Sequence, residues 1–157
     1  MVVLLTVEDN QTIEYSTKAL SLIKDDNTLD ALFFLDKVID RNRTPDIMSG
    51  YGMCIAMERG KVKEGIDLCL NAIEADPGNV FHYLNLGKVY LKDNKKAVAL
   101  DIFRKGLNIS PESDHHMEIE MILDKLGTRK RPVFSFLPRK NPANKFIGII
   151  LGKLGLR

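Results

Sequence analysis

The sequence has little of what marks secreted, membrane-spanning or disulfide-bonded proteins. Its 157 residues include only two cysteines, Cys54 and Cys69, too few for a disulfide framework. No stretch approaches the ~20 consecutive apolar residues of a spanning helix. The start, MVVLLTVEDN, also lacks the basic residues and the long apolar run of a signal peptide. These absences predict a cytoplasmic protein whose thiols are reduced.

The motifs of common enzyme classes are missing as well. The sequence has no phosphate-binding loop, no dinucleotide fingerprint and no nucleophile elbow. Its three histidines, His82, His115 and His116, form no metal-ligand pattern with the cysteines and carboxylates, and we expect them on the surface near helix starts. We therefore expect no catalysis, no cofactor and no bound metal, and we expect the cysteines to pack as small apolar residues.

Acidic residues are absent from the last part of the chain. Residues 125–157 contain nine Lys or Arg and no Asp or Glu, whereas residues 1–124 contain 14 basic and 21 acidic residues, a net charge of −7. An acidic body followed by a basic tail indicates that the tail meets something negative. Three negatively charged partners of the tail are possible: the acidic body of the chain itself, an anionic lipid surface and nucleic acid.

What the sequence does have is a repeat of 34 residues. Small residues recur at this period at Ala31, Gly65 and Ala99. The positions that keep the same register are Leu35, Cys69 and Phe103, then Val38, Ala72 and Gly106, then Pro77 and Pro111, with Pro45 just after the place of a first proline. This pattern resembles the tetratricopeptide repeat, with three units that start near Thr12, Asp46 and Val80 and a match over residues 12–126.

The resemblance implies an all-α fold in which each unit is a pair of antiparallel helices. Small residues such as Gly87 and Ala99 let the two backbones approach, and large residues such as Phe103 fill the space around that contact. Residues 25–27, 59–60 and 93–94 are polar or glycine-containing and predict the turn inside each unit. Because one unit cannot bury its apolar face alone, the units stack into a right-handed α-solenoid.

A seventh helix is expected after the third unit. Ile119, Ile122, Leu123 and Leu126 follow helical spacing. Ser110 can cap this helix with Pro111 at its first position, and Gly127 can end it. We expect it to cover the last apolar face of a solenoid domain that spans residues 1–127.

The first helices of the units line the concave groove of such a solenoid. The resemblance places six candidate partner-binding residues there: Ile47, Tyr51, Phe81, Asn85, Lys88 and Lys92. Some tetratricopeptide proteins hold the C-terminal carboxylate of chaperones through Lys, Asn and Arg in this groove. The matching places here are mostly apolar, which argues against that clamp and favours an apolar or amphipathic segment. The alternative is that these side chains pack against the chain's own N-terminus or tail.

Residues 128–157 form a separate basic and apolar extension. Pro132 and Pro138 predict an extended segment, and Asn141 with Pro142 predicts a short helix that ends near Leu154. The residues RPVFSFLPRKNPAN resemble C-terminal extensions of small bacterial tetratricopeptide proteins. The candidate contact residues of the extension are Phe134, Phe136, Leu137, Arg139, Phe146 and Ile150. We expect the extension to dock on the chain itself or on a second copy, which would make a homo-oligomer.

These patterns together predict a scaffold or adaptor that binds a protein or peptide of unknown identity. The alternative is a peripheral membrane protein whose tail binds anionic lipid, which would make the protein membrane-associated. Nucleic-acid binding ranks third, because the body is acidic and no recognition motif is present.

Overall fold

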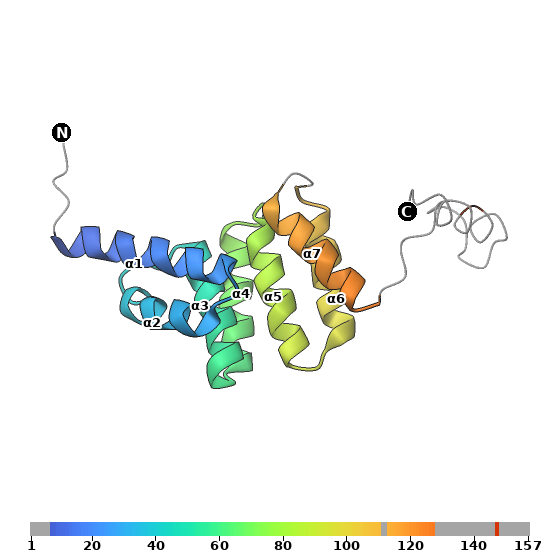
Figure 1. The fold of residues 1–157 in the computed structure, drawn as a ribbon, viewed down its shortest axis with the longest axis horizontal. Helices are drawn as coiled ribbons and strands as arrows, with labels where there is room; N and C mark the ends of the chain where they lie inside the picture. The colour runs from blue at the N-terminus through green and yellow to red at the C-terminus, as the bar shows by residue number, and fades with distance from the viewer. Residues whose placement is uncertain (1–6, 111–112, 128–146, 148–157) are drawn as a thin grey trace. The chain divides into compact units, whose positions relative to one another are not determined.

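The computed structural model describes residues 7–110, 113–127 and 147, and within them it contains seven α-helices and no strands (Figure 1). The helices are α1 (Val7–Lys24), α2 (Thr28–Val38), α3 (Pro45–Arg59), α4 (Val62–Ala75), α5 (Val80–Lys92), α6 (Lys96–Leu107) and α7 (Asp114–Lys125). The predicted all-α class is confirmed. The extended segment and short helix predicted for residues 128–157 lie outside the described residues, apart from Ile147.

The chain divides into two compact units, Met1–Leu123 and Asp124–Arg157. The predicted boundary after residue 127 stays a prediction. Within the first unit the helices pack in consecutive pairs, α1 with α2, α3 with α4 and α5 with α6, and α3 also contacts α2 and α5. This arrangement is the predicted stack of helical hairpins. Among the described helices, none is both long and apolar enough to cross a bilayer.

Left-handed residues end the first helix of each pair. Asp26 and Asn94 have φ of 58° and Gly60 has φ of 67°, so each chain reversal occurs at a residue type that tolerates this conformation. The N–H of Asn27 bonds the carbonyl of Leu22 at 2.9 Å, and the N–H of Lys95 bonds the carbonyl of Tyr90 at 2.9 Å. These two bonds satisfy carbonyls that would otherwise be left without a partner at the helix end. All three turns lie where the sequence predicted them.

Small residues hold the paired helices close together, as the repeat predicted. A Cβ atom added at Gly65 would lie 2.4 Å from the carbonyl oxygen of Gly52, and one added at Gly87 would lie 2.1 Å from the Cε1 atom of Phe103. Ala31 and Ala99 are fully buried. The alternation of small and large residues in the sequence therefore determines how closely the two helices of each pair pack.

Helix limits differ from the sequence expectation at two places. The first helix spans Val7–Lys24 and so includes residues before the expected start near Thr12, among them Glu8 and Asp9. The seventh helix begins at Asp114, and the N–H of His115 bonds the hydroxyl of Ser113 at 3.3 Å. The predicted cap at Ser110 is therefore wrong. The helix ends before Gly127, whose φ is 65°, as predicted.

Candidate functional site

The first helices of the three pairs share one face with α7. Lys24 at the end of α1 pairs with Asp114 of α7 at 3.0 Å. Lys88 of α5 pairs with Asp26 at 3.3 Å and with Glu118 of α7 at 2.7 Å. These contacts bring the two ends of the helical array together across the face that the repeat pattern assigns to the groove.

The six predicted groove residues differ in how far they reach the surface. Ile47 is 1% exposed, Asn85 is fully buried, and Phe81 is 8% exposed with its ring centre 5.0 Å from that of His115. These three side chains face the packing between helices more than the solvent. Their assignment as partner-binding residues stays a prediction.

The other three predicted groove residues are more accessible. The hydroxyl of Tyr51 donates to Asp36 of α2 at 3.3 Å, and Arg59 pairs with the same carboxylate. Lys88 keeps 13% of its side chain exposed between two carboxylates, and Lys92 is exposed. Both ion-pair partners of Lys88 come from the chain itself, so a partner's acidic group must displace Asp26 or Glu118 to reach it.

A small pocket of about 190 Å³ lies on this shared face. It is lined by Leu20, Lys24, Asp46, Asn79, Phe81 and His115. Leu20 and the Phe81 ring supply an apolar wall, while the other side chains supply polar groups at the rim. The pocket therefore suits one apolar side chain held among polar contacts, rather than a whole helix.

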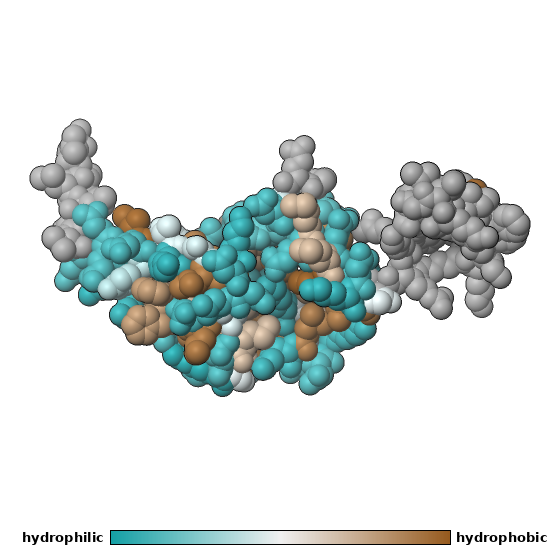
Figure 2. All heavy atoms as spheres, in the orientation of Figure 1, coloured by the Kyte–Doolittle hydropathy of each residue, from teal (hydrophilic) through white to brown (hydrophobic). Residues whose placement is uncertain are grey.

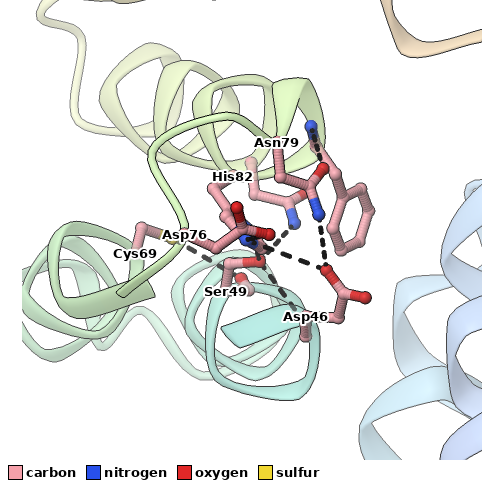
Figure 3. A network of polar contacts seen from close by, with 8 residues as sticks. Asp46, Ser49, Cys69, Asp76, Asn79 and His82 are labelled. Atoms are coloured by element: carbon pink, nitrogen blue, oxygen red, sulfur yellow. Dashed lines mark hydrogen bonds and ion pairs between the residues drawn. The ribbon is translucent and has the colours of Figure 1, made fainter. Parts of the chain in front are cut away.

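A buried polar network joins α3 to α5 beside this pocket (Figure 3). The Oγ of Ser49 lies 2.8 Å from Nδ1 of His82, and Nδ2 of Asn85 donates to the same oxygen at 3.2 Å. All three side chains are fully buried. The expectation that His82 is a surface residue is therefore wrong, because its ring fills the space between the second and third units.

Two carboxylates face the outer side of the His82 ring. Oδ1 of Asp46 and Oδ2 of Asp76 each lie 3.8 Å from Nε2 of His82, beyond hydrogen-bond distance, and Nδ2 of Asn79 donates to Asp46 at 2.9 Å. Burial lowers the pKa of His82, against the opposing effect of the two aspartates. His82 is therefore neutral at pH 7, and these contacts are not ion pairs.

Ser49, His82 and Asp46 lie in a row, as the nucleophile, the base and the acid do in a catalytic triad. Ser49, however, is fully buried and does not line the neighbouring pocket. A nucleophile must reach the reacting atom of a substrate, and this hydroxyl instead bridges two helices. The network consequently acts as a hydrogen-bonded tie between α3 and α5. The expectation that the chain lacks catalysis stays a prediction.

Acidification should destabilise the protein through His82. The unfolded imidazole binds a proton near pH 6.5, whereas the folded one binds it only at lower pH, so the unfolded state holds more protons in that window. The free energy of unfolding is then expected to fall as the pH drops below about 6.5, by at most about 1.4 kcal/mol per pH unit for this one group. Urea titrations between pH 7.5 and 5 measure this slope.

A matched variant isolates the contribution of His82. His82→Gln is expected to flatten the slope in part, because burial also lowers the pKa of His115 and that histidine contributes in the same direction. A wild-type protein whose stability does not change between pH 7 and 5 would contradict the buried neutral imidazole.

The two cysteines lie in the core and not at an open site. Cys54 and Cys69 are fully buried, and burial raises the pKa of Cys54 to about 12 and raises the pKa of Cys69 as well. Such thiols are poor nucleophiles at neutral pH. Within residues 7–110 and 113–127, no group of three or more His, Cys, Asp or Glu side chains is placed to hold a metal ion.

Comparison with known proteins gives the class of this fold. Residues 68–100, which contain α5 and parts of α4 and α6, match the family model of the tetratricopeptide repeat. The chain thus contains a tetratricopeptide repeat, and a solved tetratricopeptide protein shares its fold, as the 34-residue period predicted. No curated protein matches the sequence.

Solved structures share the fold at low sequence identity. One is YrrB, described as a TPR protein with an unusual peptide-binding site, at 22% identity and a TM-score of 0.54 over 70% of this chain and 57% of YrrB. A second is an O-GlcNAc transferase mutant from Thermobaculum terrenum, at 16% identity and a TM-score of 0.59 over 76% of this chain and 23% of the transferase. A third is the second TPR domain of human RPAP3 in complex with an HSP70 peptide, at 17% identity and a TM-score of 0.53 over 76% of this chain and 97% of that domain. The chain thus spans little more than half of YrrB and under a quarter of the transferase.

Proposed function

We propose that the protein is an interaction scaffold that binds a short peptide segment of another protein on the face shared by α1, α3, α5 and α7. The pocket lined by Leu20, Phe81 and His115 carries this proposal, because it joins an apolar wall to a polar rim on the face of the first helices. Two of the structural relatives support it, since YrrB is described with a peptide-binding site and the RPAP3 domain with a bound peptide.

The charges around the pocket argue against a peptide that binds through a free carboxylate. Lys24 is paired with Asp114, and Lys88 is paired with Asp26 and Glu118, so the charges of these two lysines are already neutralised. An arrangement that recognises a free carboxylate needs unpaired donors, and these lysines would first have to lose their partners. The proposed ligand is therefore an extended segment with an apolar side chain for the pocket and hydrogen-bonding groups on either side.

Substitutions at the pocket test this proposal with a peptide selected from a random phage-displayed library on the full chain. Phe81→Ala is expected to weaken binding by about 2 kcal/mol, because it removes the aromatic wall. Since Phe81 is mostly buried, circular dichroism must show that the variant stays folded. His115→Ala, at a half-buried rim position, gives a second variant with less risk to the core.

A matched control uses an exposed apolar residue that does not line the pocket. Leu70 of α4 is 44% exposed and does not line the pocket, so Leu70→Ala should leave the affinity unchanged. Equal affinities for wild type, Phe81→Ala and His115→Ala, with all three folded, would rule the pocket out as the peptide site.

The second candidate function is attachment to an anionic membrane surface through the C-terminal residues. The observation in its favour is the charge of residues 125–157, which carry nine Lys or Arg and no acid. The six predicted contact residues of this segment lie outside the described residues. Flotation with vesicles that contain phosphatidylserine, with and without residues 128–157, separates this function from peptide binding. Unchanged flotation after the deletion excludes it.

A further inference from the structure

An apolar stripe runs along the exposed side of α2. Leu29 is 64% exposed and Phe33 is 57% exposed, one helical turn apart, and Nζ of Lys37 lies 4.0 Å from the centre of the Phe33 ring. Apolar surface gathers over α2 in the space-filling view (Figure 2). The positions one and two periods later are Lys63, Asp67 and Asn71, then Ala97, Asp101 and Lys105. The first unit alone carries large apolar side chains at these positions, so repeat packing does not explain them.

A second exposed stripe lies on α7. Met117 is 60% exposed, Met121 is 57% exposed, and the Glu120 side chain between them is 63% exposed. We refer to Leu29, Phe33 and Lys37 as the α2 stripe and to Met117, Glu120 and Met121 as the α7 stripe. Each stripe places two large apolar side chains four residues apart, beside one charged side chain.

The repeat register explains why the α7 stripe can receive another helix. One period earlier the same positions are Tyr83, Leu86 and Gly87 of α5. There a Cβ atom on Gly87 would touch Phe103 of α6, and one on Gly106 of α6 would lie 3.0 Å from Cβ of Tyr83. This face of α5 is therefore the one that α6 covers. On α7 the equivalent face is open within the described residues.

The two stripes are complementary in charge and in apolar character. Lys37 of one would oppose Glu120 of the other, while Leu29 and Phe33 would oppose the two methionines. A contact between two α2 stripes would hold two lysines and no carboxylate of either stripe, and a contact between two α7 stripes would hold two glutamates and no cation of either stripe. A contact between different stripes is thus favoured over a symmetric contact.

We propose that a second copy of this chain is the occupant of these surfaces, with the α2 stripe of one molecule docked on the α7 stripe of the next. Because the stripes lie on different helices, each molecule keeps one stripe free for another neighbour. Association is then head to tail, and it extends with concentration rather than stopping at a dimer. This self-association is independent of the peptide pocket.

Sedimentation equilibrium of the full chain over a range of concentrations tests the proposal. The average mass is expected to rise continuously above that of the monomer. Phe33→Asp and Met121→Asp should each weaken association by roughly tenfold or more, because each places a carboxylate in one apolar half of the contact. Val98→Asp changes another exposed apolar residue, 40% exposed on α6, and should leave the mass distribution unchanged.

Mixing the two variants gives the most specific result. Phe33→Asp keeps its α7 stripe and Met121→Asp keeps its α2 stripe, so an equimolar mixture should form a one-to-one dimer that cannot extend. Neither variant alone should form this species. A Lys37→Glu and Glu120→Lys pair, mixed in the same way, is expected to restore association through a reversed ion pair.

Three results would overturn the proposal. A full chain that stays monomeric at high micromolar concentration lacks the contact. A full chain that is monomeric but associates after removal of residues 128–157 would assign the α7 stripe to the chain's own C-terminal residues. Association that persists unchanged in both Asp variants would place the contact elsewhere on the molecule.

Discussion

Phe103→Ala is expected to lower the free energy of unfolding by about 3–5 kcal/mol, one of the two largest effects in this protein. The Phe103 ring is fully buried and packs on Gly87, where an added Cβ atom would lie 2.1 Å from Cε1 of Phe103. Its removal leaves a cavity at the contact between α5 and α6, and the stiff helix pair can close that cavity only in part. Urea unfolding followed by circular dichroism measures the loss.

The control for this prediction lies on the same helix. Val98 is 40% exposed, so Val98→Ala should change the unfolding free energy by only about 0.5 kcal/mol. A Phe103→Ala variant as stable as Val98→Ala would show that the third unit is not packed around this ring, and the repeat register would then be wrong.

Gly65→Ala is expected to destabilise the protein by about 3 kcal/mol, the upper part of the range for overpacking a core. The added methyl group would lie 2.4 Å from the backbone oxygen of Gly52 and 3.0 Å from Cβ of Ala56. Backbone atoms cannot turn away as a side chain can, so α3 and α4 must move apart. The midpoint of urea unfolding should fall accordingly.

Gly78→Ala is the matched control for Gly65→Ala. The nearest atom to a Cβ at Gly78 is Oδ1 of Asp76 at 3.9 Å, an ordinary contact. This variant should therefore be close to wild type in stability. Should Gly65→Ala and Gly78→Ala unfold at the same urea concentration, the close approach of α3 and α4 does not exist in solution.

The fold was largely predictable because the small residues at the helix contacts recur at a fixed spacing in the sequence. Ala31, Gly65 and Ala99 recur every 34 residues, and all three are buried where the second helix of each pair meets the first. The turns at Asp26, Gly60 and Asn94 were predictable for a local reason, since these residue types tolerate the left-handed conformation.

The candidate site was much less predictable, because its contacts join residues that are distant in the sequence. Lys88 was predicted as a groove residue open to a partner, but Asp26, 62 residues away, and Glu118 neutralise it. These groups meet only through the three-dimensional packing of the helices, which a repeat pattern in the sequence does not specify.

The buried network was missed for a different reason. His82 was predicted to be on the surface from its place near a helix start, yet its ring bonds Ser49 inside the core. The available signal was Ser49, because the corresponding position is Tyr15 in the first unit and Tyr83 in the third. A small polar residue in place of an aromatic one leaves room for a neighbouring ring, and here His82 takes that room.

Peptide binding at the pocket between the first helices and α7 is the central proposal for this protein. Amide chemical-shift mapping of the isotopically labelled full chain, titrated with the library-selected peptide, tests it most directly. The largest shifts are expected at Leu20, Lys24, Phe81 and His115, which line the pocket. Saturable binding whose largest shifts fall on α4 or α6, with none at these four residues, would contradict it.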